Sequence, residues 1–197
     1  MGFIGLGIYF FHLYAITSIF DFGDEKTYSK DDLINNYKNN KVNINALKDY
    51  FNKVVPVDRI VEIEFKNDKE IDRLAVTKLS TKSPNYSDQY FCEWNLNIKS
   101  IKVDSIIKSF GWTLQTLAEV KEHLDKANCI GITNGEPTII NFKRNGFGMY
   151  SYDIFLSKIP DNLKKQYDDS CRHILYNENV SLEYGGGAIG PQCFPGK

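Results

Sequence analysis

Two Asn-Gly pairs, Asn134-Gly135 and Asn145-Gly146, lie eleven residues apart between apolar and aromatic segments. Asn-Gly supplies the positive φ angles that a tight type I′ hairpin turn requires. Two such turns in succession predict a meander of three antiparallel strands, because each turn reverses the chain between neighbouring strands. We place these strands at Cys129–Thr133, Pro137–Lys143 and Phe147–Phe155.

The segment before the first predicted strand has the pattern of a helix. Ser29 and Asp32 form a capping-box motif, which predicts a helix start, and apolar residues then recur on one face as far as Val54. Asn40 lies in a helical turn where the periodic pattern calls for an apolar residue. We therefore expect a helix over Lys30–Val54 that kinks or breaks near Asn40.

The remaining elements follow from alternating and helical patterns. Strands are expected at Ile60–Phe65, Leu74–Leu79, Tyr90–Ile98, Ile174–Tyr176 and Val180–Tyr184, and helices at Val103–Phe110, at Leu114–Ala127 and after Pro160. The sequence therefore predicts an α+β fold. It consists of a mostly antiparallel sheet of roughly six to eight strands packed by two or three helices, and an N-terminal apolar helix precedes it.

Residues 3–20 carry no formal charge, and an apolar run of this length at a chain start is at the threshold for spanning a bilayer. We therefore expect an apolar membrane anchor or signal-like segment over residues 1–22, a linker over residues 23–29 and a single α+β domain over residues 30–197.

We favour an uncleaved anchor with the domain outside the cytoplasm, because no basic residue precedes the run and no small-x-small cleavage site follows it. Two alternatives stay open. One is a cytoplasmic protein with a buried N-terminal helix, and the other is cleavage of the segment as a signal peptide.

Charge and loop composition exclude several classes of ligand. The net charge of −1 and the pI near 6.3 provide no field that would attract nucleic acid. The glycines of Gly185–Pro191 do not form a phosphate loop, because such a loop needs Gly-Lys-Ser/Thr at the start of a helix. We therefore predict no nucleic-acid partner and no cofactor.

Asp169, Cys171 and His173 form the most suggestive local cluster in the sequence. On a strand, Cys171 and His173 would point the same way, close enough to share a metal ion or a proton. A zinc site would need two more ligands with recognisable spacing, and the sequence offers none. We therefore predict no metal site and interpret the cluster first as ordinary packing. Catalysis by the three residues is the alternative.

Four cysteines are present, none in a Cys-x-x-Cys pair, so disulfides are possible if the domain lies outside the cytoplasm. Cys171 with Cys193 is the preferred pair, because it would hold the glycine-rich tail against the last hairpin. Cys92 and Cys129 lie on apolar strands and are equally compatible with free core residues.

Two groups of surface residues complete the predictions. Glu62 and Glu64 alternate with apolar residues, which indicates the solvent-facing side of a strand. The second hairpin of the meander is an expected contact surface because Tyr, Phe and Arg are common at protein interfaces. Its candidate binding residues are Arg144, Phe147, Tyr150 and Tyr152.

These observations favour a non-enzymatic interaction domain, tethered at a bacterial membrane and binding a protein or a cell-envelope component. An inhibitor or an immunity-type protein fits that description. The alternative is a small cysteine-dependent hydrolase or transferase that uses Cys171, His173 and Asp169.

Overall fold

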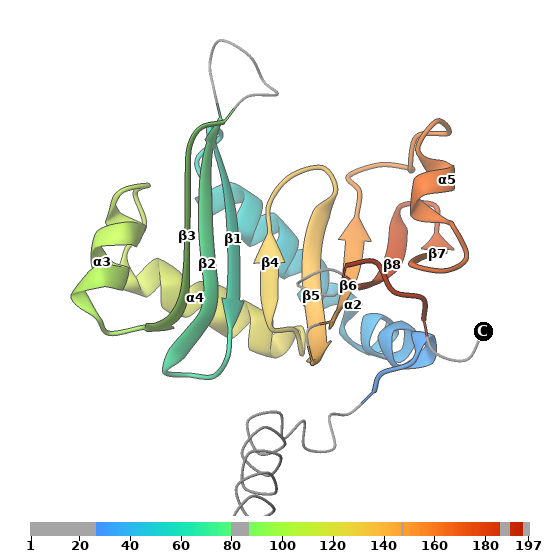
Figure 1. Cartoon of the computed structure of the whole chain (residues 1–197), viewed down its shortest axis with the longest axis horizontal. Helices are drawn as coiled ribbons and strands as arrows, with labels where there is room; N and C mark the ends of the chain where they lie inside the picture. Colours follow the sequence, from blue (N-terminus) through green and yellow to red (C-terminus); the bar gives the residue numbers. More distant parts are fainter. Residues whose placement is uncertain (1–26, 80–86, 147, 186–189, 195–197) are drawn as a thin grey trace, which may run out of the picture.

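The computed structural model describes residues 27–79, 87–146, 148–185 and 190–194, and within them eight strands form one antiparallel sheet. The strands are β1 (Arg59–Phe65), β2 (Glu70–Leu79), β3 (Ser87–Asn97), β4 (Gly131–Thr133), β5 (Thr138–Asn145), β6 (Gly148–Ile154), β7 (His173–Asn177) and β8 (Val180–Gly185). Their order across the sheet is β3-β2-β1-β4-β5-β6-β8-β7 (Figure 1). The predicted α+β fold with a mostly antiparallel sheet is confirmed.

The helices are α2 (Lys30–Val54), α3 (Ile101–Lys108), α4 (Leu114–Lys126) and the short α5 (Lys164–Tyr167). Figure 1 shows α2 and α4 behind the sheet, α3 beyond β3, and α5 beside β7 at the other end. The predicted anchor lies outside the described residues, as does most of the linker. No helix among the described residues is both long and apolar enough to cross a membrane.

Helix α2 begins and bends where the sequence predicts. The Ser29 hydroxyl accepts from the backbone N–H of Asp32, and the Asp32 carboxylate accepts from the N–H of Ser29. Asn40 leaves the helical region, at φ −117° and ψ 15°, and its side-chain amide donates to the carbonyl and side-chain oxygens of Asn36. This local bonding competes with the helical ladder and accounts for the kink.

The meander is confirmed, but its two Asn-Gly pairs do not form the expected turns. Thr133 pairs with Ile139, so the first connection is longer than a two-residue hairpin. Asn134 instead binds β1: its side-chain oxygen accepts from the N–H of Val61 (2.6 Å) and its amide donates to the carbonyl of Arg59 (2.9 Å). In the second hairpin Asn145 pairs with Gly148, so Asn145 is a strand residue and not the first residue of the turn.

The sheet has one apolar face and one polar face. Val61, Ile63 and Phe65 of β1 belong to the core that packs against α2 and α4, and alternation places Glu62 and Glu64 on the opposite face. The pairing register of the neighbouring strands extends this polar face across the sheet. It includes Asn141, Ser151, Asp153, His173, Ser181 and Glu183. In Figure 1 no described helix lies in front of β1 to β4 on this side.

Candidate functional site

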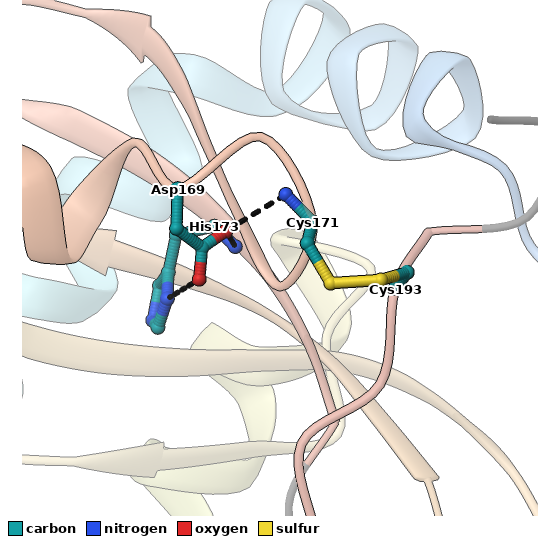
Figure 2. The surroundings of a disulfide bond; sticks show 4 residues. All are labelled: Asp169, Cys171, His173 and Cys193. Atoms are coloured by element: carbon teal, nitrogen blue, oxygen red, sulfur yellow. Dashed lines mark hydrogen bonds and ion pairs between the residues drawn. A yellow bond between two sulfur atoms is a disulfide. The ribbon is translucent and has the colours of Figure 1, made fainter.

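The predicted catalytic residues lie together between α5 and β7, but Cys171 is not a free thiol. Its sulfur is bonded to that of Cys193 (Figure 2), as the preferred pairing predicts. Cys92 and Cys129 are free. Closing a loop of 22 residues in this way stabilises the fold by roughly 3 kcal/mol. Since the nucleophile of a cysteine enzyme is the thiolate, the proposed role of Cys171 does not fit this oxidised state.

Asp169 organises the backbone that leads into β7. One of its carboxylate oxygens, Oδ1, accepts from the backbone N–H groups of Cys171 (2.8 Å) and His173 (2.9 Å). Burial opposes ionisation of Asp169, but these bonds favour the charged form more strongly and lower its pKa. The other oxygen, Oδ2, lies 3.7 Å from His173 Nδ1, so the carboxylate faces the imidazole ring (Figure 2).

The imidazole of His173 faces two carboxylates from neighbouring strands. His173 pairs with Glu183 of β8, and Asp153 of β6 lies on the same face of the sheet. His173 Nε2 is 3.6 Å from Asp153 Oδ2 and 3.7 Å from Glu183 Oε1. The three residues are buried, with exposed fractions of 2% for Asp153, 7% for His173 and 9% for Glu183. We call them the β6–β7–β8 cluster.

Burial dominates the electrostatics of the cluster. It raises the pKa of Asp153 well above its usual value, and the neighbouring Glu183 carboxylate adds to this rise. Burial also lowers the pKa of His173 and outweighs the opposing effect of Glu183. Glu183 has its own partners, because Arg172 Nε donates to its Oε1 (2.8 Å) and the Ser151 hydroxyl donates to its Oε2 (3.2 Å).

A cavity of about 450 Å³ opens over the cluster. Besides the three cluster residues, its lining includes Lys165, Tyr167, Asp169 and Arg172. The Tyr167 ring stands edge-on to the His173 ring, with the two ring centres 5.4 Å apart. The cluster is therefore largely shielded from solvent, but the cavity leaves it accessible from one side.

Sequence reasoning singled out His173 and Asp169 but missed Asp153 and Glu183. Both missed residues sit on strands whose polar positions alternate with apolar ones, which indicates solvent exposure by default. Their proximity to His173 comes from the order in which β6, β8 and β7 pair, and no local spacing encodes it.

The predicted contact residues of the second hairpin are corrected in part. Tyr150 and Tyr152 have no exposed surface because both belong to the core, where Tyr152 contacts α2 and the Tyr150 ring stacks on Tyr184. Arg144 forms an ion pair with Glu64 through both carboxylate oxygens, with Nη2 to Oε2 at 2.6 Å. Phe147 lies outside the described side chains. The hairpin tip therefore offers less contact surface than its composition indicates.

The same ion pair corrects the prediction for Glu64, which is only 2% exposed. Burial raises the pKa of Glu64, while the Arg144 guanidinium acts in the opposite direction. Glu62, by contrast, keeps about a quarter of its side chain exposed and bonds Arg73 Nη1 at 2.6 Å.

A second candidate surface lies where β1, β2 and β3 present the polar face of the sheet. Tyr90 and Trp94 of the edge strand β3 project on this side and are 62% and 51% exposed. The guanidinium carbon of Arg73 stands 5.0 Å from the Trp94 ring centre. We call Glu62, Arg73, Tyr90 and Trp94 the β1–β3 surface. Its sequence signal is the spacing of Tyr90 and Trp94, which are four residues apart on one strand and therefore lie on the same face.

No model of a known protein family, no curated protein and no solved structure matches this chain. Its function therefore has to be inferred from the geometry and chemistry of these two places on the sheet.

Proposed function

We propose that the chain is a non-enzymatic interaction domain that binds a protein partner through the β1–β3 surface. The observation that carries this proposal is the pair of exposed aromatic side chains, Tyr90 and Trp94, on a sheet face that no described helix covers. Large aromatic residues and arginine are enriched among the residues that contribute most to protein binding. While these side chains stay exposed to water, they bury no apolar surface and do not stabilise the folded chain through the hydrophobic effect.

The charges of this surface favour a protein over a nucleic acid. Arg73 is paired with Glu62, and the nearby Arg144 is paired with Glu64, so the cations are neutralised in place. A nucleic-acid surface would instead present unpaired basic side chains to phosphates. Paired charges around an aromatic centre fit the polar rim of a protein interface.

The edge strand gives the partner a further way to bind. β3 is eleven residues long and pairs on one side only, with β2, in the described sheet. An unpaired strand edge can accept an added strand, with main-chain hydrogen bonds for affinity and side-chain contacts for specificity. Tyr90 and Trp94 would provide those contacts.

The location of the domain is part of the proposal. We propose that residues 3–20 anchor the chain in a membrane and that the domain lies outside the cytoplasm. The disulfide between Cys171 and Cys193 supports this location, because disulfides persist in oxidising compartments. A tethered binding domain of this kind fits an inhibitor or immunity-type protein.

Site-specific photo-cross-linking tests the proposed surface in the cells that make this protein. A photoreactive phenylalanine derivative in place of Tyr90 is expected to give a discrete protein adduct. The same probe in place of Val42, which is 82% exposed on α2 behind the sheet, is expected to give none. The adduct should weaken several-fold when Trp94→Ala is added. Equal cross-linking at both positions, or none at Tyr90, would overturn the proposal.

A further inference from the structure

The β6–β7–β8 cluster, far across the sheet from the β1–β3 surface, has the composition and spacing of a metal site. Asp153, His173 and Glu183 each offer one ligand atom, and these atoms lie within 4.8 Å of one another. Imidazole nitrogen with carboxylate oxygens is a donor set used for zinc. Ligand atoms about 2.1 Å from a shared ion lie at most about 4.2 Å apart, so the His173–Asp153 and His173–Glu183 distances of 3.6 and 3.7 Å fit one ion, and rotation of the side chains would close the rest of the spacing.

Two polar atoms of the cluster have no hydrogen-bond partner among the described residues: Asp153 Oδ2 and His173 Nδ1. Asp153 Oδ2 is the oxygen that faces His173 Nε2, and Asp153 is 2% exposed. A buried polar atom without a partner has lost its hydrogen bonds to water and gained none in return, which destabilises the fold. Such an atom in a native structure needs an explanation, and a bound ion is one of those that apply.

The side chains around His173 are arranged as they commonly are around a metal-bound histidine. Such a histidine commonly directs its second ring nitrogen at a carboxylate, which fixes the orientation of the ring. Here Nε2 faces Asp153 and Glu183, while Nδ1 faces Asp169 Oδ2 at 3.7 Å. The two backbone N–H bonds to Oδ1 hold Asp169 in that place.

Charge in the cluster leaves room for a cation. Asp153 and Glu183 bring two carboxylates, and Arg172 donates to Glu183 Oε1 through both Nε (2.8 Å) and Nη2. Oε1 is thereby occupied by Arg172, but Oε2 accepts one bond, from the Ser151 hydroxyl (3.2 Å), so its second lone pair can bind a metal ion while Oε1 holds Arg172. No cationic group of the described residues lies within ion-pairing distance of Asp153 except His173.

We propose that Asp153, His173 and Glu183 bind a divalent transition-metal ion of the zinc class, with Asp169 as a positioning residue. The cavity of about 450 Å³ gives the ion and its remaining water ligands access from solvent. The site would join three strands at one end of the sheet, close to the disulfide. It does not depend on the protein-binding role of the β1–β3 surface.

Calorimetric titration of the disulfide-intact, full-length chain in detergent with Zn²⁺ tests the site. Wild type is expected to bind one ion. Asp153→Asn is expected to lose affinity by more than about 100-fold, and Asp169→Asn by about 10–100-fold, the usual effect of losing an outer-shell partner. Asp161→Asn is the matched control and should bind like wild type, because the Asp161 side chain is exposed and pairs with Lys164, outside the cluster.

X-ray absorption at the zinc edge of the wild-type complex provides a measurement that needs no variant. The expected first shell contains nitrogen and oxygen only. Sulfur in that shell would place the ion on Cys92 or Cys129 and overturn the proposal, as would equal zinc affinity in wild type and Asp153→Asn. No binding by wild type at millimolar Zn²⁺ would also overturn it. Near-UV circular dichroism checks that each variant is folded.

Discussion

Replacement of Tyr152 by alanine is expected to lower the free energy of unfolding by about 4 kcal/mol, as for other large aromatic residues removed from a core. The Tyr152 side chain has no exposed surface and packs against the rings of Tyr37 and Phe142. Its hydroxyl donates to the carbonyl of Leu33 (2.9 Å) and accepts from the Asn36 amide (3.1 Å), which joins β6 to α2. Urea-induced unfolding measures the change.

Two controls separate the ring of Tyr152 from its hydroxyl and from surface tyrosines. Tyr152→Phe keeps the packing and should cost only about 1 kcal/mol, the worth of a typical hydrogen bond. Tyr90→Ala removes a tyrosine that is 62% exposed and should cost less than about 0.5 kcal/mol. If Tyr152→Ala were no more damaging than Tyr90→Ala, the assignment of Tyr152 to the core would be wrong.

Replacement of Arg144 by alanine is expected to cost about 3 kcal/mol, because it leaves the buried Glu64 carboxylate without its counterion. Glu64 keeps 3% of its side chain exposed and Arg144 keeps 30%. Removal of one partner of a buried pair usually costs about 3–5 kcal/mol, and the partial exposure of Arg144 places the expected value at the lower end. Denaturant unfolding near pH 8 measures it.

The cost of Arg144→Ala should depend on pH, with a sign set by Glu64. Burial raises the pKa of Glu64 in the folded protein, so the folded state binds its proton more tightly than the unfolded state. Stability then falls as pH rises above the unfolded glutamate pKa of about 4.3, and more steeply without Arg144. The deficit of Arg144→Ala should therefore be smaller at pH 4 than at pH 8.

A surface ion pair provides the matched control for Arg144. Lys102 contacts Glu93 at 2.7 Å, but their side chains are 52% and 32% exposed. Lys102→Ala should therefore cost less than about 1 kcal/mol at either pH. A loss for Arg144→Ala as small as that of Lys102→Ala, or a loss that does not change with pH, would contradict a buried charge pair.

Local patterns in the sequence were sufficient for most of the fold. The capping box at Ser29 and the bend at Asn40 are decided by neighbouring residues, and both are found where expected. The hairpins also follow, because alternation and turn residues act over a few positions. The first Asn-Gly pair departs from a tight turn at the point where the Asn134 side chain bonds to β1, and that partner is 73 residues away.

The candidate site depended on long-range pairing that the sequence does not display. Tyr150 and Tyr152 resembled contact residues by type, but the register of β6 places them on the core side of the sheet. Asp153 and Glu183 resembled solvent-facing positions, but the order β6-β8-β7 and the segment around α5 bury them beside His173. Sequence reasoning identified the segment that leads into β7 and only one of the three cluster residues, His173.

The exposure of Trp94 in the full-length chain tests most directly whether the β1–β3 surface is open to a partner. The chain has two tryptophans, of which Trp94 is 51% exposed and Trp112 is 2% exposed. In the Trp112→Phe variant the remaining fluorescence reports on Trp94 alone, and acrylamide should quench it several-fold more strongly than it quenches Trp112 in the Trp94→Phe variant. Equal, weak quenching of both would mean that the full-length chain covers this surface, and it would contradict the proposed binding role.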